Sequence, residues 1–339
     1  MKNVMMSEPP HLFVICDGNS EVGYGHFFRC LHLVHALKAS LPTLQLTWMG
    51  AINESLLTQI HADLLTEKFI VVDNANDAMR QILPSNRSWV LSDSYLLSEC
   101  DLDALANRHY LIAIDDFGKY SHAKAQAVLN FCVSATQYRY QAINQLLGTG
   151  YFLTDPRLNP VREFKLSMQA SFEAPLQILI AMGGFDRFDV GAKIALAISE
   201  SKLNSNITLL GTSKQILPNS INHLTRSKDM AQLYRQSDLV ISGGGLIKYE
   251  SAYCAIFNIA VSQTPEQLAE SEAFAAHNLC LSYGLAQDWH KESFITWFEA
   301  LDLTALCAQL KTASANEFVS NSTEKAANAL AILIEKSAR

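Results

Sequence analysis

The first candidate for chemistry is a glycine-rich loop that leads into a histidine. Residues 17–29 read DGNSEVGYGHFFR, directly after an apolar run at 12–16. Glycines at a strand-to-helix turn let the backbone approach an anion, and a helix N-terminus attracts negative charge. The third glycine of a dinucleotide fingerprint is replaced by Phe28, and the chain has no Walker A sequence. The loop is therefore not a standard phosphate cradle.

His26 follows Gly25 on the expected first turn of a helix. A helix N-terminus favours the neutral imidazole, which can act as a general base. Asp17, at the end of the preceding strand, is expected to orient this ring. The alternative is that His26 is an ordinary helix-start residue. His32 and His35, further along the helix, fit packing or solvated roles.

Two more glycine-rich turns lie in the second half of the chain. Residues 182–186 read MGGFD, and residues 242–250 read SGGGLIKYE. Both turns place backbone N–H groups where a phosphate can bind, although a plain tight turn explains the first equally well. Glu250, one turn into the following helix, can accept hydrogen bonds from two vicinal hydroxyls, as a ribose presents. The second turn together with Glu250 predicts a nucleotide site.

Polar residues at other strand ends are weaker candidates. Asp93 and Tyr95 lie in SDSY, Asp115 and Asp116 in IDDF, and Asn130 ends VLN. Paired carboxylates can serve acid–base work or bind Mg²⁺. Neighbours in an extended segment point opposite ways, so the two adjacent aspartates are not expected to serve one site. Capping the next segment is their alternative role.

Short apolar runs that alternate with helical patterns must position these residues. Strands are expected at 12–16, 44–49, 69–73, 88–93, 110–115 and 127–133, and then at 176–182, 206–211, 238–244 and 257–263. Helices are expected at 26–40, 53–65, 74–83, 98–108, 191–201, 229–237, 248–255 and 266–278, with two more towards the C-terminus. This alternation predicts an α/β protein with doubly wound parallel sheets. Ligands bind such sheets beyond the carboxyl ends of the strands.

The strand–helix pattern restarts after a proline-rich stretch. Residues 154–175 hold three of the nine prolines and no clear strand. The prediction is an N-terminal Rossmann-like domain over 1–155, a linker over 156–175 and a C-terminal Rossmann-like domain over 176–339, with a central cleft between the domains. A chain of 339 residues, 49% of them hydrophobic, has enough material for two cores.

Composition argues against several functional classes. Lys and Arg number 26 against 33 Asp and Glu, and the formal charge of −7 argues against non-specific nucleic-acid binding. Seven widely spaced cysteines without a C-x-x-C pair indicate reduced thiols in a cytoplasmic protein, with no metal site. No segment approaches the roughly 20 apolar residues of a membrane span, and no cleaved leader is expected.

On these residues the sequence resembles the PseG family of nucleotide-sugar hydrolases, which share the GT-B fold with MurG-type transferases. The family opens with a strand, an Asp and G-x-G-H-x-x-R, matched here by Asp17, Gly23, Gly25, His26 and Arg29. Further matches are Asp93 and Tyr95 (D-x-Y), Asp115 and Asp116 (D-D), Asn130 (L-x-N), Gly183, Gly184 and Asp186 (M-G-G-x-D), Gly244, Gly245 and Glu250 (the glycine turn), and Gln267 (N-Q). The chain departs from the family at Leu246 and Ile247, where a hydroxyl residue is usual, and at Glu266, where Asn is usual.

The resemblance implies a hydrolase of pseudaminic acid biosynthesis, the route that supplies flagellin glycosylation. Water would attack the anomeric carbon of UDP-2,4-diacetamido-2,4,6-trideoxy-β-L-altropyranose with inversion and release UDP, without metal or cofactor. The catalytic residues would be His26, as the base, and Asp17, which would orient the imidazole or the attacking water. The substrate would be bound by Gly25, Arg29, Tyr95 and Asn130, and the nucleotide by Gly183, Gly184, Asp186, Gly244, Gly245, Glu250 and Gln267.

Two alternatives to the hydrolase stay open at this point. One is a GT-B glycosyltransferase that uses a UDP-sugar donor and an acceptor hydroxyl in place of water. The other is a non-catalytic protein that binds a nucleotide-sugar. All three functions predict a UDP-sugar as the partner molecule, and the protein is expected to be a monomer.

Overall fold

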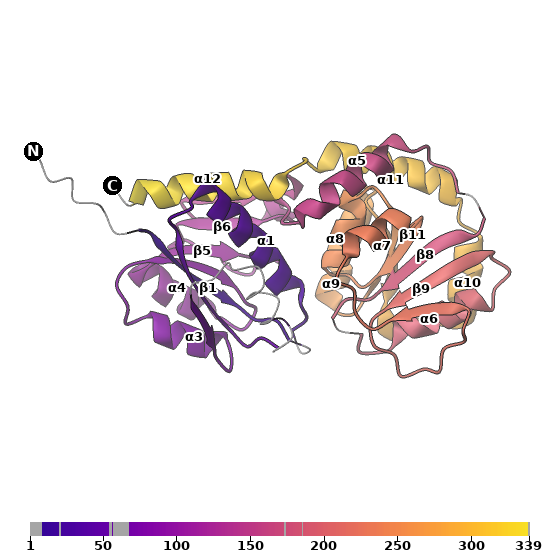
Figure 1. Cartoon of the computed structure of the whole chain (residues 1–339), viewed down its shortest axis with the longest axis horizontal. Coiled ribbons are helices and arrows are strands. Elements are labelled where there is room, and N and C mark those ends of the chain that lie inside the picture. Colours follow the sequence, from indigo (N-terminus) through magenta and orange to yellow (C-terminus); the bar gives the residue numbers. More distant parts are fainter. Residues whose placement is uncertain are drawn as a thin grey trace, which may run out of the picture. The chain divides into compact units, whose positions relative to one another are not determined.

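The computed structural model describes residues 9–19, 22–53, 56, 68–172, 174–184 and 186–337. The chain forms two compact units (Figure 1). Unit 1 comprises Met1–Asp155 together with Asn321–Arg339, and unit 2 comprises Pro156–Ser320. Within the described ranges, no helix combines the length and hydrophobicity that a bilayer span requires.

A parallel sheet in the order β3-β2-β1-β4-β5-β6-β7 forms the centre of unit 1. Its strands are β1 (His11–Cys16), β2 (Gln45–Gly50), β3 (Lys68–Val71), β4 (Trp89–Asp93), β5 (Tyr110–Ile114), β6 (Ala127–Asn130) and β7 (Asn144–Leu147). The central strands β1, β4 and β5 are mostly apolar and almost fully buried because helices cover both faces of the sheet. The strand order reverses between β1 and β4, so the carboxyl ends of these two strands mark the expected ligand position.

Four described helices flank this sheet: α1 (Gly25–Ser40), α3 (Ala75–Ile82), α4 (Glu99–Arg108) and α12 (Ser322–Ser337). The apolar sides of α3 and α4 share one core with the sheet. Side chains fix where both helices begin, since Asn74 caps α3 and Ser98 forms a capping box with Asp101 in α4. On the other face α1 packs against α12 (Figure 1).

Unit 2 repeats this plan with a parallel sheet in the order β10-β9-β8-β11-β12-β13. Its strands are β8 (Leu176–Ala181), β9 (Ser205–Leu210), β10 (Ile221–Leu224), β11 (Leu239–Ser242), β12 (Phe257–Ser262) and β13 (Leu281–Leu285). Its helices are α5 (Asn159–Ser167), α6 (Val190–Ser199), α7 (Met230–Gln236), α8 (Leu246–Tyr253), α9 (Pro265–Ala276), α10 (Lys291–Glu299) and α11 (Leu303–Glu317). Here the order reverses between β8 and β11, where the two predicted glycine turns stand.

The ten predicted strands all appear, but three further strands were not predicted. These are β7, β10 and β13, and each lies at or beside the edge of its sheet with few buried residues. An edge strand pairs on one side only and needs no continuous apolar run, so the pattern of buried strands does not reveal it. The helix expected at 53–65 lies mostly outside the described residues.

The contacts divide the chain differently from the predicted domain limits. The segment 156–175, predicted as a linker, contains α5, whose buried Arg162 donates to the carbonyl oxygens of Tyr253 (2.5 Å) and Phe318 (3.1 Å) in unit 2. The helix α12, predicted in the second domain, belongs to unit 1, where Thr323 Oγ1 accepts from the Thr154 amide at 2.8 Å. Helical periodicity shows that a helix has a buried face, but not which sheet that face covers.

Candidate functional site

Five side chains of unit 1 meet beyond the carboxyl ends of two neighbouring strands. We call His26, Arg29, Asp93, Tyr95 and Asp116 the His26 cluster. The first two lie on the first two turns of α1, the next two at and just after the end of β4, and the last just after β5. Because β4 and β5 are parallel and adjacent, their ends reach the same edge of the sheet.

A buried carboxylate holds the imidazole of His26. His26 Nδ1 lies 2.7 Å from Asp93 Oδ1, and Arg29 donates to both oxygens of Asp93 at 2.6 Å. Burial alone would raise the pKa of Asp93, but the charge of Arg29 and then that of His26 outweigh it and hold this pKa well below its usual range. Asp93 is therefore ionised and can only accept hydrogen bonds.

The ionised Asp93 determines which nitrogen of His26 carries the proton. Arg29 Nη2 lies 3.0 Å from Nδ1, but the closer approach of a carboxylate oxygen requires a proton on that nitrogen. A neutral His26 thus keeps its lone pair on Nε2, on the opposite side of the ring. The side chain of His26 is 11% exposed, whereas that of Asp93 is fully buried. The pair can act as a base whose orienting carboxylate is shielded from water.

A second carboxylate completes the His26 cluster. Arg29 Nη1 donates to both oxygens of Asp116, at 2.8 and 2.9 Å, and the Tyr95 hydroxyl donates to Asp116 Oδ2. The Tyr95 ring stands edge-on against the His26 ring, with centroids 4.5 Å apart and an interplanar angle of 87°. One guanidinium therefore links the carboxylate that orients His26 to the carboxylate that holds Tyr95.

The structure corrects the predicted partner of His26, because Asp93 rather than Asp17 is bonded to the imidazole. Asp17 Oδ1 accepts from the Ala51 amide at 2.9 Å, and Oδ2 accepts from the Ser94 hydroxyl at 3.4 Å. Burial raises the pKa of Asp17, which these hydrogen bonds offset only in part. Asp17 thus joins the loops after β1, β2 and β4. The signal for Asp93 was its place at the end of the strand next to β1 in a doubly wound sheet.

The two adjacent aspartates diverge as predicted. Asp115 Oδ1 accepts from the amides of Phe117 and Gly118 at 2.9 and 3.0 Å, and Oδ2 lies 2.9 Å from His122 Nε2. Asp115 therefore caps the segment after β5, while Asp116 faces the His26 cluster. The alternation of an extended backbone separates the two roles.

Asn130, predicted to bind substrate, has no exposed surface in this structure. Its Nδ2 donates to the Tyr140 hydroxyl, and its Oδ1 accepts from the Cys132 amide, both at 2.8 Å. Both polar atoms of the amide are thus used within unit 1. A strand-end position alone could not show that Asn130 turns inward at the end of β6.

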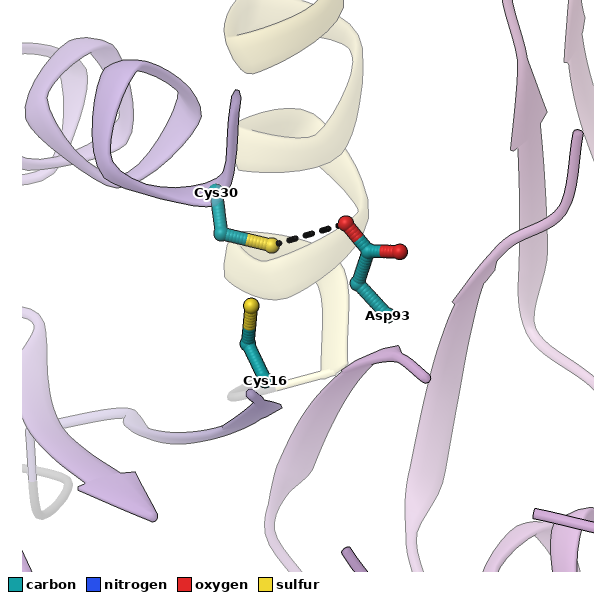
Figure 2. A group of neighbouring side chains, drawn as sticks. All are labelled: Cys16, Cys30 and Asp93. Carbon is teal, nitrogen blue, oxygen red and sulfur yellow. Dashed lines mark hydrogen bonds between the residues drawn. The ribbon is translucent and has the colours of Figure 1, made fainter. Parts of the chain in front are cut away.

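Two thiols lie next to Asp93 (Figure 2). Cys16 and Cys30 are fully buried, and the ligand atoms of these two residues and Asp93 all lie within 4.8 Å of one another. Burial raises the pKa of both thiols, that of Cys30 well above its usual value. Metal ions bind thiolates, and Asp93 is already committed to Arg29 and accepts from Cys30 Sγ at 3.3 Å. This chemistry favours packing over metal binding.

The glycine turns of unit 2 meet at the ends of β8, β11 and β12. A Cβ on Gly243 would lie 2.5 Å from the Met182 carbonyl oxygen, and one on Gly244 would lie 2.7 Å from Gln267 Cβ. Gly183 has φ +93°, and among the described residues no atom outside the adjoining backbone lies within 4 Å of the Cβ that would be added to Gly245. Packing thus explains the glycine at two positions, while Gly245 stands before open space at the N-terminus of α8, which has no side-chain cap.

The other predicted nucleotide residues make contacts within unit 2. Glu250 Oε2 accepts from the Tyr234 hydroxyl at 2.6 Å. Asp186 caps α6 by accepting from the amides at 190 and 191, at 3.0 and 2.8 Å. Gln267 Oε1 accepts from the amide of residue 263 at 3.0 Å and so fixes the turn between β12 and α9. Asp186 and Gln267 therefore shape the backbone at this edge of the sheet.

Alanine substitutions at the two adjacent glycines should separate packing from binding. Gly244→Ala should lower the free energy of unfolding by about 1–3 kcal/mol, because its Cβ would collide with Gln267. Gly245→Ala, with φ −96° and open space, should change it by less than about 0.5 kcal/mol. Urea unfolding of both variants measures the difference. Equal destabilisation by the two substitutions would contradict this account of the turn.

Comparison with known proteins gives distant relatives. No protein-family model matches the sequence. An uncharacterized protein of Methanocaldococcus jannaschii is 23% identical over 276 residues, which cover 75% of this chain and 56% of that protein. The spore coat polysaccharide biosynthesis protein SpsG of Bacillus subtilis is 22% identical over 298 residues, or 82% of this chain and 84% of SpsG. The chain thus spans about half the length of the archaeal relative and most of the bacterial one.

Solved structures of glycosyltransferases resemble the whole chain. MurG of Acinetobacter baumannii gives a TM-score of 0.66 at 16% identity, covering 97% of this chain and all of MurG. UGT89C1 of Arabidopsis thaliana in complex with UDP gives 0.67 at 12% identity, covering 96% of this chain and 99% of the other. Identities this low show the fold alone. The two parallel α/β units and these structural neighbours establish that the chain has the GT-B fold.

Proposed function

We propose that the protein hydrolyses a UDP-sugar at the anomeric carbon and releases UDP and the free sugar with inversion. The observation that carries the proposal is the His26–Asp93 pair, in which Arg29 keeps the carboxylate ionised. In that pair Asp93 holds the proton of Nδ1, so the imidazole can accept a proton at Nε2, at the strand ends where ligands bind in doubly wound sheets. The sequence resemblance supports a 2,4-diacetamido-2,4,6-trideoxy hexose as the sugar.

The reaction needs a base and a place for negative charge. His26 takes a proton from water as the water oxygen bonds to the anomeric carbon, and the bond to the diphosphate oxygen breaks with its electron pair leaving on UDP. Asp93 stabilises the imidazolium that forms. A general base of this kind contributes a factor of about 10² to 10⁴ in rate. Because UDP is already a fair leaving group, the chemistry does not depend on a metal.

The glycine turn before α8 is the proposed diphosphate site. The uncapped N-terminus of this helix offers backbone N–H groups in front of the open space at Gly245. Glu250, one turn along α8, would bind the ribose hydroxyls. A neighbour of the same fold supports a UDP-sugar ligand, since UGT89C1 was solved both with UDP and with UDP-L-rhamnose.

Glu250→Ala should weaken UDP binding about 10-fold or more, because a carboxylate hydrogen bond contributes roughly 1.5–3 kcal/mol. Calorimetric titration of UDP measures the effect, and Glu250→Gln keeps an acceptor for the Tyr234 hydroxyl. The exposed Glu272 on α9 supplies the control, since Glu272→Ala should leave UDP affinity unchanged. An unchanged affinity in both Glu250 variants would refute the ribose role.

Glycosyl transfer is the second candidate function, favoured by structural neighbours that are named as a glycosyltransferase and a glucosyltransferase. The same base would then take the proton of an acceptor hydroxyl. Proton and phosphorus NMR of the purified protein with UDP-2,4-diacetamido-2,4,6-trideoxy-altrose and no acceptor separates the two. Release of UDP and free sugar supports the hydrolase. An intact substrate that turns over only when an acceptor is added would establish the transferase instead.

A further inference from the structure

Tyr95 combines an exposed ring with a hydroxyl that is already engaged. The residue is 50% exposed, and its ring stands edge-on against His26. Its hydroxyl donates to Oδ2 of Asp116. A phenol has a single proton, so a hydroxyl that donates to a carboxylate has only oxygen lone pairs left for a ligand. Next to His26, the Tyr95 oxygen can therefore accept a hydrogen bond but cannot donate one.

Asp116 is itself fixed from the other side. It is 8% exposed, and Arg29 Nη1 contacts both of its oxygens at 2.8 and 2.9 Å. Arg29 in turn is held by the fully buried side chain of Asp93. A carboxylate held in this way keeps its place, so the direction in which Tyr95 donates its proton is set by the fold.

We propose that Asp116 is a positioning residue that fixes the Tyr95 hydroxyl as an acceptor for an N–H or O–H group of the bound sugar. The site then favours a sugar that presents a hydroxyl or amide N–H next to His26. It disfavours one that presents a carbonyl or carboxylate oxygen there, because two acceptors would face each other. This inference rests on the proposed function, since it takes the ligand to be a sugar.

Tyrosine ionisation tests the Asp116–Tyr95 link without any substrate. Loss of solvent around the hydroxyl and then the charge of Asp116 raise the pKa of Tyr95 well above its usual value. The phenolate absorbance of wild type minus that of Tyr95→Phe should therefore show no ionisation near pH ~10, the usual range of tyrosine. The same difference is then measured between Asp116→Asn and the double variant that also carries Tyr95→Phe. There the Tyr95 ionisation should lie closer to the usual range than in wild type.

Asp115→Asn is the matched control for the titration. It removes the neighbouring carboxylate, which bonds to His122 and to backbone amides, and should leave the Tyr95 ionisation where wild type has it. A Tyr95 ionisation near pH ~10 in wild type would overturn the proposal, as would an equal effect of Asp115→Asn and Asp116→Asn. If Asp116→Asn does not fold, a Tyr95 ionisation near pH ~10 in wild type would still overturn the proposal.

Steady-state kinetics test whether the Tyr95 hydroxyl accepts a hydrogen bond from the bound sugar. Tyr95→Phe and Asp116→Asn should each lower kcat/KM about 10-fold, the size of one hydrogen bond, and the double variant should lose no more than either alone. Additive losses would mean that Asp116 does not act through Tyr95. Absence of turnover in wild type would refute the proposed function and with it the sugar acceptor role, while the titration would still decide whether Asp116 fixes Tyr95.

Discussion

Replacing His26 by alanine should lower kcat for UDP-sugar hydrolysis by about 10² to 10⁴-fold. The imidazole is the base whose lone pair Asp93 directs away from the buried carboxylate. UDP affinity should stay within about twofold, because the proposed nucleotide residues all lie in unit 2. Steady-state kinetics and calorimetric titration of UDP measure the two quantities on the same preparation, and His26→Asn should behave in the same way.

His32 supplies the control for this prediction. It lies on the same helix, partly buried, with its ring stacked on that of Phe28. Removing it by His32→Ala tests whether any loss of a histidine from α1 reduces turnover. A kcat of His26→Ala within a few-fold of wild type would exclude His26 as the base and would shift attention to the other groups of the His26 cluster.

Arg29→Met should lower the free energy of unfolding by about 3–5 kcal/mol at neutral pH, the cost of leaving buried charge without its partner. Two carboxylates, Asp93 and Asp116, depend on this guanidinium. Urea unfolding at pH 7 measures the loss. Arg80→Met is the surface control, because the Arg80 side chain is 71% exposed and its pair with Asp77 should contribute about 0–1 kcal/mol. Similar losses in both variants would contradict the assigned role of Arg29.

The stability of Arg29→Met should also depend on pH with a definite sign. In wild type the pKa of Asp93 is depressed, so its contribution is present above the unfolded pKa of about 3.9 and is lost as the pH falls. Without Arg29, burial dominates and raises the pKa of Asp93 above the unfolded value. The folded variant then favours the protonated carboxyl, and its stability is lost as the pH rises. The deficit relative to wild type should therefore be smaller at pH ~4.5 than at pH 7. A deficit that grows on acidification would show that Asp93 is not the group left uncompensated.

The fold could be predicted from the sequence because its central strands are buried on both faces. Continuous apolar runs such as those of β1 and β5 result from that burial, and turn residues between them mark the carboxyl ends. Edge strands such as β7 carry no such run and were missed. The place of α12 in unit 1 also could not be inferred, since the pattern of an amphipathic helix does not show which sheet the helix packs against.

For the residues of the His26 cluster, the sequence predicted the strand and helix ends on which they lie but not their hydrogen-bond partners. His26 and Arg29 were placed correctly at the start of α1, since a glycine turn after a strand leads into a helix N-terminus. The partner of His26 was wrong: Asp17 and Asp93 end neighbouring strands, and the direction of a side chain at a strand end depends on the loop that follows. Asn130 shows the same limit, because its amide turns inward.

The membership of α12 in unit 1 affects the order in which the two units can fold during synthesis. The chain passes from unit 1 to unit 2 after Asp155 and returns after Ser320, so unit 2 is inserted in the sequence of unit 1. All of unit 2 is therefore synthesised before α12. During translation, domains generally fold as units from the N-terminus onwards. Here unit 2 should reach its native packing before unit 1. The side of α1 that contacts α12 should stay uncovered until α12 has emerged.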